Sequence, residues 1–209
     1  MRIKTPLFYI HIDIMLIIFV FFSIFIKSIR DVFSSYIICY LFIVFHEASH
    51  IFVAAFFGKE IDTFYMRLCG VSVEFVKERF TINNKFKNSK IYLIKELMIY
   101  VAGPVSNIVL ALIFHKIKMI YEINIFLGIL NLIPIFPLDG YNLIKNILFI
   151  HFCDIKVIKV LNIINRCSKI IMLIIGIIIL IYKCNPCLLF FLIYVIILDS
   201  SKVGRKVTF

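Results

Sequence analysis

The chain has 209 residues, of which 63% are hydrophobic, and its mean hydropathy is +1.05. Since a water-soluble globular protein is typically about half apolar, this composition excludes an ordinary soluble domain and indicates lipid as the main solvent. The net charge is +11, but the basic residues are scattered between apolar blocks, so they predict contact with anionic lipid and not with nucleic acid.

Six apolar runs are candidates for membrane-spanning helices, each of which needs about 20 mostly apolar residues. They cover residues 8–26, 33–57, 91–114, 121–138, 170–182 and 187–198. The fifth run is short, and basic side chains at its ends are expected to reach the membrane interface. We therefore predict a single all-α polytopic membrane domain over residues 1–209, with the first run retained as an anchor.

The segments between these runs are more polar. Residues 63–75 alternate apolar and polar side chains on either side of Gly70, which predicts a short β-hairpin between the second and third runs. An extended substrate could add a strand to this hairpin. Residues 76–90 are charged and expected at the interface, and residues 141–168 predict amphipathic helices on the cytoplasmic face.

The distribution of basic residues orients the predicted bundle. With six spans, both termini and the segments 58–90 and 139–169 lie on one side of the membrane. That side carries seventeen of the 23 Lys and Arg residues. Since basic residues concentrate on the cytoplasmic side, both termini are predicted to be cytoplasmic.

Two histidines with a glutamate between them lie inside the second run. In His46-Glu47-Ala48-Ser49-His50 the two imidazoles share one helix face, one turn apart, and can bind one metal ion. Glu47 is close enough to take a proton from water at that ion, which is the chemistry of His-Glu-x-x-His zinc proteases. The alternative is a polar cluster that joins helices by hydrogen bonds. Three ionisable residues in one turn at bilayer depth are costly, however, and favour a functional site.

A third ligand is needed, because catalytic zinc usually takes three protein ligands and keeps one open position. Asp139 follows a segment in which Pro134 and Pro137 forbid a regular helix. Broken backbone at membrane depth is tolerated only where it is buried in protein or lines a cavity, which suits a ligand. The second and fourth runs cross in the same direction, so the histidines and Asp139 are predicted at a similar depth near the cytoplasm.

One further motif lies in the third run. Gly103-Pro104 combines a small residue with a helix breaker, which allows a neighbouring helix to approach closely. A simple kink explains this pair equally well.

Together these motifs resemble the site-2 protease family of intramembrane metalloproteases. The matching segments are residues 46–50, 103–107 and 131–140, and their order and spacing fit over about residues 8–150. The resemblance implies zinc held by His46, His50 and Asp139, with Glu47 as general base. It also implies that Asn131 helps to position the substrate strand.

Within the family, the small size and six-span layout are similar to the sporulation branch of endospore-forming bacteria. That likeness implies a multi-pass protein of the bacterial cell membrane that removes the pro-sequence of a sigma-factor precursor. Membrane inhibitor or regulator proteins are further expected partners. Neither a nucleotide-binding CBS tail nor a PDZ domain is expected, and Tyr141 stands where the family often has a second glycine.

Two other functions compete with proteolysis. A membrane transporter or other metal-binding membrane protein could use the same histidines without hydrolysis, but it has no need of Glu47 as a base. A thiol-redox protein could use Cys184 and Cys187, which have redox-motif spacing, but this leaves the histidine motif unexplained.

Overall fold

The computed structural model describes most of the chain. The described residues are 2–4, 9–25, 27–67, 70–75, 90–152, 155–183, 189, 192–193 and 195–197. Internal contacts divide the chain into two compact units, Met1–Ile129 and Leu130–Phe209. Residues 76–89 of the predicted interfacial segment, the Cys184/Cys187 pair, the C-terminal tail and half of the predicted span 187–198 lie outside the described residues. The prediction of a single domain stays a prediction.

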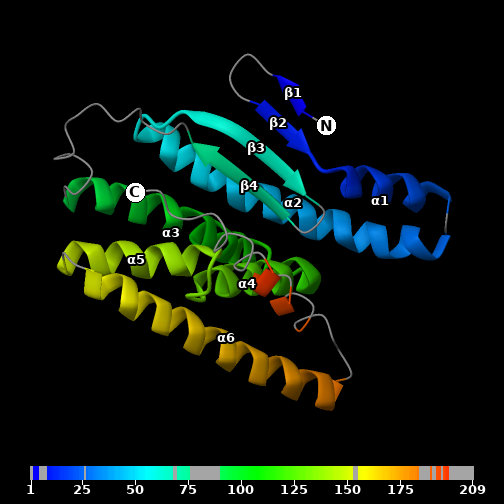
Figure 1. Cartoon of the computed structure of the whole chain (residues 1–209). Helices are drawn as coiled ribbons and strands as arrows, with labels where there is room; N and C mark the ends of the chain where they lie inside the picture. Colours follow the sequence, from blue (N-terminus) through cyan, green and yellow to red (C-terminus); the bar gives the residue numbers. More distant parts are fainter. Residues whose placement is uncertain are drawn as a thin grey trace. The chain divides into compact units, whose positions relative to one another are not determined.

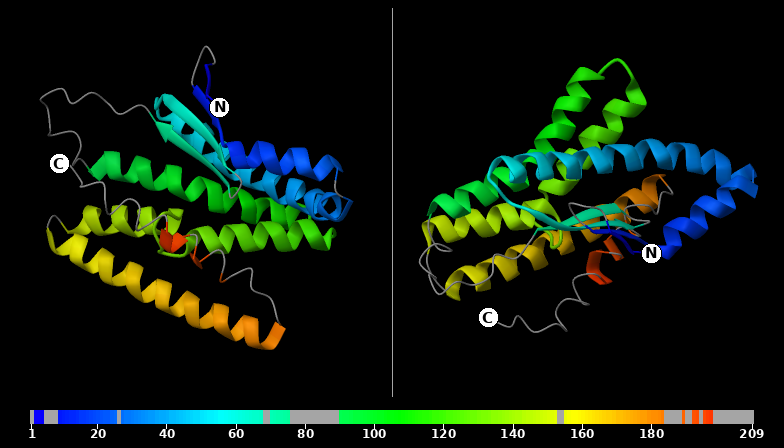
Figure 2. Two further views of the ribbon diagram at one scale, coloured as in Figure 1. Left: turned by 45° about the vertical axis from the view of Figure 1, so that its right-hand side comes forward. Right: turned by 90° about the horizontal axis from the view of Figure 1, so that it is seen from above.

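Helices dominate the first unit (Figure 1). They are α1 (Ile14–Phe25), α2 (Lys27–Phe56), α3 (Lys90–Ile113) and α4 (Lys118–Leu132), whose last turn lies beyond Ile129. α2 packs against both α1 and α3, and α3 and α4 form a helical hairpin (Figure 2). Gly128 lets α4 approach α3, since a Cβ there would lie 3.2 Å from the carbonyl oxygen of Pro104.

A glycine follows the end of α2, and the residue after it pairs with α3. Gly58 has a φ of +76°, which favours glycine. The amide of Gly58 donates to the carbonyl of Ala55 and the amide of Lys59 to that of Ala54, both at 2.9 Å, which is the Schellman pattern of a helix C-terminus. Lys59 then pairs with Glu96 of α3, with 3.2 Å between Nζ and Oε1.

A four-stranded sheet packs on these helices. Its order is β1 (Arg2–Lys4), β2 (Tyr9–Ile12), β3 (Ile61–Arg67) and β4 (Gly70–Phe75). β2 and β3 run parallel, and β3 and β4 form an antiparallel hairpin with Phe64 opposite Val73. β4 also contacts α2. The hairpin predicted over residues 63–75 is therefore present, within a larger sheet.

The second unit consists of α5 (Asp139–His151), α6 (Ile155–Lys183) and the described residues near the C-terminus. α5 and α6 contact each other. Its apolar core contains Ile135, Met172, Leu192 and Val195, each with 8% or less of its surface exposed. Ile133 and Leu138 pack on this core, so the segment between α4 and α5 is anchored in the unit by its own side chains.

The first predicted span is wrong in its extent. Within this range Tyr9–Ile12 form β2 and Ile14–Phe25 form the 12-residue helix α1. The reason lies at Asp13, whose Oδ1 accepts from the amide of Met15 at 3.3 Å and so caps the start of α1. The amide of Asp13 donates to the carbonyl of Met66 at 2.9 Å and continues the pairing of β2 with β3. The predicted all-α class is corrected accordingly, because the N-terminal segment adds two strands to the expected hairpin.

Two further boundaries differ. The predicted span 170–182 is the second half of α6, which has 29 residues and takes in much of the segment predicted as interfacial helices. Neither glycine nor proline interrupts the sequence before Gly176, so the helix continues. The predicted span 121–138 ends its helix at Leu132, ahead of Pro134.

Three of the described helices are long and apolar enough to cross a membrane, where six were predicted. They are Tyr36–Phe56, Lys90–Ile113 and Val157–Tyr182. On the last of these, Ile170, Ile174 and Ile181 each leave at least half of their surface exposed. Exposed apolar surface on this scale is not compatible with water and indicates contact with lipid.

Candidate metal centre

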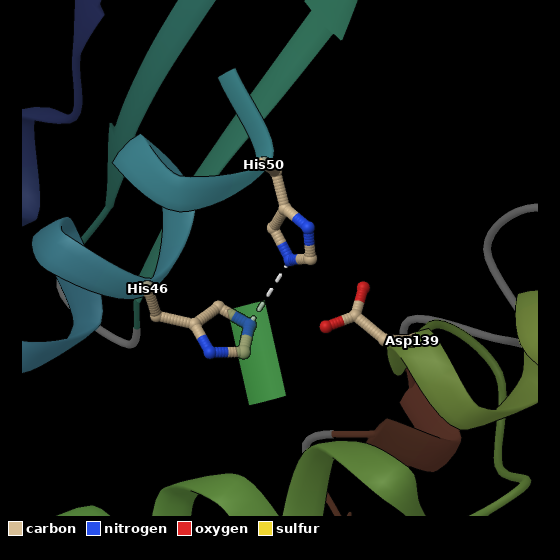
Figure 3. A group of neighbouring side chains, drawn as sticks. All are labelled: His46, His50 and Asp139. Carbon is tan, nitrogen blue, oxygen red and sulfur yellow. Dashed lines mark hydrogen bonds between the residues drawn. The ribbon is translucent and has the colours of Figure 1, made fainter. Parts of the chain in front are cut away.

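His46 and His50 lie four residues apart on α2, and their side chains point to the same place (Figure 3). Both are buried, with 4% and 6% of their surface exposed. Their Nε2 atoms are 3.2 Å apart, and the rings lie nearly perpendicular at 84°. Two nitrogen ligands of one tetrahedral zinc ion, each at 2.0–2.1 Å, lie about 3.3 Å apart. The pair therefore fits a single zinc ion through both Nε2 atoms.

The other ring nitrogen of His50 is held by α3. Its Nδ1 lies 2.6 Å from the backbone carbonyl oxygen of Ile99. A carbonyl oxygen can only accept, so Nδ1 carries the proton and donates it. In the neutral ring the lone pair is then on Nε2, the atom that can bind a metal. Such a hydrogen bond to the second nitrogen is the usual support of a metal-binding histidine.

Gly103 makes room for the two rings. It is buried in α3, and a Cβ built there would lie 2.6 Å from His46 Nε2 and would overlap the His50 ring. Any side chain at this position would occupy the space in front of the two Nε2 atoms. The close approach predicted for Gly103-Pro104 is thus present, and the neighbour that approaches is the histidine pair of α2.

Glu47 lies on α2 next to His46 and is half-buried. It is one residue from a histidine whose Nε2 faces the candidate metal position. A carboxylate there can accept a proton from water near the histidines. Ser49, in the same turn, donates from its hydroxyl to the carbonyl of Phe45 at 2.9 Å and so stays engaged with its own helix.

Asp139 is the first residue of α5 in the second unit (Figure 3). It is half-buried. Its carboxylate belongs to the N-terminal turn of α5, where the helix dipole favours a negative charge. Gly140 follows it, and a Cβ there would overlap the carbonyl group of Leu132. The start of α5 can therefore lie against the end of α4 only with glycine at position 140.

The segment before Asp139 is irregular, as the two prolines predict, and its backbone is paired. The amides of Ile135 and Leu138 each donate to a nearby carbonyl at 2.8 Å. The amide of Phe136 donates to Oδ1 of Asn165 on α6 at 3.1 Å. The amides of this broken backbone are thus paired within the protein, which backbone at membrane depth requires. Asn131, the predicted substrate-positioning residue, is half-buried in the last turn of α4.

Three polar features near these residues were not predicted as parts of the site. The carbonyl of Ile99 and the side chain of Asn165 act through hydrogen bonds between elements distant in sequence, for which the sequence carries no local signal. Asn107 is buried on α3, and neither side-chain nitrogen nor oxygen has a partner among the described residues. It lies within the Gly103-Pro104-Val105-Ser106-Asn107 motif, but the sequence does not show its burial.

Comparisons with known proteins support the fold. No protein-family model matches the chain. A zinc metalloprotease of Methanocaldococcus jannaschii is 26% identical over 127 residues, which is 54% of this chain and 34% of that protein. The chain thus matches about a third of the length of this relative. The solved structure of the site-2 protease from Methanocaldococcus jannaschii superposes with a TM-score of 0.61 at 23% identity, over 93% of this chain and 91% of that one. The chain has the fold of a site-2 protease.

Proposed function

We propose that this protein is an integral-membrane zinc metalloendopeptidase of the site-2 protease type. The observation that carries the proposal is the pair of Nε2 atoms 3.2 Å apart on α2, with Glu47 between the two histidines in sequence. The shared fold and the zinc metalloprotease among its relatives support it. The three apolar helices support a location in a membrane.

The proposed ligands are His46, His50 and Asp139, which together offer two imidazole nitrogens and one carboxylate. This donor set suits zinc, because three protein ligands leave a fourth position for water or substrate. When bound, zinc polarises a peptide carbonyl and lowers the pKa of water. The α2 backbone and the His50–Ile99 hydrogen bond orient the rings toward that position.

Glu47 is the proposed general base, and Asn131 the proposed group that positions the substrate strand. The Glu47 carboxylate takes the proton from the attacking water and later gives it to the amine of the leaving peptide. Asn131 offers both a donor and an acceptor for substrate backbone.

The finer assignment rests on the sequence alone. We propose that the protein belongs to the bacterial cell membrane, with cytoplasmic termini. We further propose that it resembles the stage IV sporulation protein FB of endospore-forming bacteria and removes the pro-sequence of a sigma-factor precursor. Co-expression with such a precursor, followed by its change in mobility on a gel, tests this part separately from the zinc chemistry.

The proposed function is tested by metal content and by one substitution. We expect about one zinc per chain in purified protein, because three ligands hold a single ion. Glu47→Gln should keep this zinc and abolish cleavage, since it removes the basic oxygen and keeps the size of the side chain. Zinc binding without any peptide cleavage by the wild type would favour the transporter. A chain without metal at every stage of purification would contradict both.

A further inference from the structure

The side chain of Asn107, one helical turn along α3 from Gly103, is fully buried and without a hydrogen bond among the described residues. Its exposed fraction is 0%, and both Nδ2 and Oδ1 lack a partner among the described residues. Asn124 on α4 is equally buried and its Oδ1 also lacks a partner among the described residues, but its Nδ2 donates to the carbonyl of Ile120 at 2.9 Å. A buried amide with both groups unpaired is destabilising, so its presence points to a partner that binds there.

The helix geometry shows where this amide faces. On α3, Asn107 is about 40° around the axis from Gly103 and about 60° from Pro104, at 100° per residue. Gly103 faces the rings of His46 and His50. Pro104 and Asn107 both face α4. The Cβ position at Gly128 of α4 lies 3.2 Å from the carbonyl oxygen of Pro104 and 3.7 Å from the Cβ of Asn107. Asn107 therefore points between α2 and α4.

The direction of its side chain brings the amide toward the histidines. Helical side chains lean back over the preceding turn, so the amide of Asn107 covers the turn that contains Gly103. The axial separation of these two residues is about 6 Å, and the lean shortens it. Since Gly103 has no side chain, this position of α3 places none between the amide and the two rings.

The chemistry of the unpaired groups selects the partner. A carboxamide offers a donor and an acceptor side by side, which matches the C=O and N–H groups of a polypeptide main chain. A substrate that is extended for cleavage exposes such groups, and in a membrane they need partners. On the basis of the proposed function, we propose that Asn107 hydrogen-bonds the main chain of the substrate beside the scissile bond. The recognised class is an extended peptide backbone, independent of its side chains.

The test uses Asn107→Leu, which keeps the size of the side chain and removes both polar groups. The probe is a single-span peptide of Leu and Ala with a central Gly-Ser pair and a quenched fluorophore. It is chosen from a set of such peptides because the wild type cleaves it. We expect zinc content to stay the same and the Tm in detergent to stay the same or rise. The KM should increase about tenfold. In the inactive Glu47→Gln background, adding Asn107→Leu should also raise the dissociation constant of the peptide about tenfold.

Asn124→Leu is the matched control, since it removes an equally buried asparagine from the same helical hairpin. It should leave KM and peptide affinity unchanged. If Asn107 only supports the fold, Asn107→Leu should lower the Tm and lose zinc together with the change in KM. This outcome overturns the inference. Unchanged KM and affinity in Asn107→Leu overturn it as well. Absence of zinc and of cleavage in the wild type would instead show that the proposed function itself fails.

Discussion

His46 and His50 lie on an unbroken stretch of α2, whereas Asp139 follows the irregular segment Ile133–Leu138. On α2 the spacing of four residues alone puts both imidazoles on one face. Ahead of Asp139, no helix periodicity applies, and the backbone is held by contacts such as that of Phe136 with Asn165. A side chain on a regular helix is positioned by its neighbours in sequence, and a side chain after broken backbone by residues far away in the chain.

The largest effect on the histidine pair of α2 is expected from filling the space at Gly103 of α3. Gly103→Ala should reduce zinc from about one per chain to near zero and abolish cleavage, because a methyl group there overlaps the Nε2 atoms. Metal analysis of the purified variant measures the effect. Val105→Ala, an exposed position on the same helix, is the control and should keep its zinc. Normal zinc in Gly103→Ala would show that the rings bind no metal in this arrangement.

The corresponding change in the irregular region removes the acceptor for Phe136. Asn165→Leu leaves the amide of Phe136 unpaired and should destabilise the segment by about 1–3 kcal/mol. We expect a lower Tm and weaker zinc binding, since Asp139 is the proposed third ligand. Asn162→Leu is the control, because Asn162 is exposed on the same helix. An equal Tm for Asn165→Leu and Asn162→Leu would contradict this role of Asn165.

A third change concerns β4, the last strand in the order of the described sheet. Only two residues join β3 to β4, so we expect Arg67 and Gly70 to exchange hydrogen bonds and the amide of Val73 to face away from β3. If an extended substrate pairs with this edge, Val73→Pro should lower cleavage several-fold with zinc intact, since proline has no N–H to donate. Val71→Pro should act in the same way.

Ser72→Pro is the contrasting variant at this edge. Ser72 lies opposite Tyr65, in a pair expected to be hydrogen-bonded, so its loss should weaken the hairpin itself. Cysteines placed along β4 should also crosslink to a bound substrate. Unchanged cleavage by both valine variants, without crosslinks, would mean that helices alone hold the substrate.

The smallest effect is expected where α2 meets α3 away from the histidines. The Lys59–Glu96 pair is about one-fifth exposed on each side, and Glu96 also accepts from the Tyr92 hydroxyl at 2.9 Å. Lys59→Gln should cost about 0–1 kcal/mol, seen as a slightly lower Tm, with cleavage unchanged. Lys118→Gln, in a far more exposed pair with Glu122, should change the Tm still less. A large loss of activity in Lys59→Gln would show that this contact supports the histidine face of α2.

The amino-acid sequence by itself determined the features that depend on near neighbours. The i and i+4 spacing of His46 and His50, the glycine at position 103 and the break before Asp139 are all local, and each appears in the structure. The β-hairpin around Gly70 follows from alternation of side chains in the same way. Asp139 as the third ligand and Glu47 as the base stay predictions.

Only the tertiary structure decided features that depend on long-range pairing. Residues 9–12 are apolar enough for a helix, yet they form β2 because β3, about fifty residues later, offers a parallel partner. His50 Nδ1 donates its proton to a backbone carbonyl of α3, and the amide of Phe136 donates to a side chain of α6. Hydrogen bonds between distant segments leave no periodic pattern in the sequence, so they emerge only when the chain is folded.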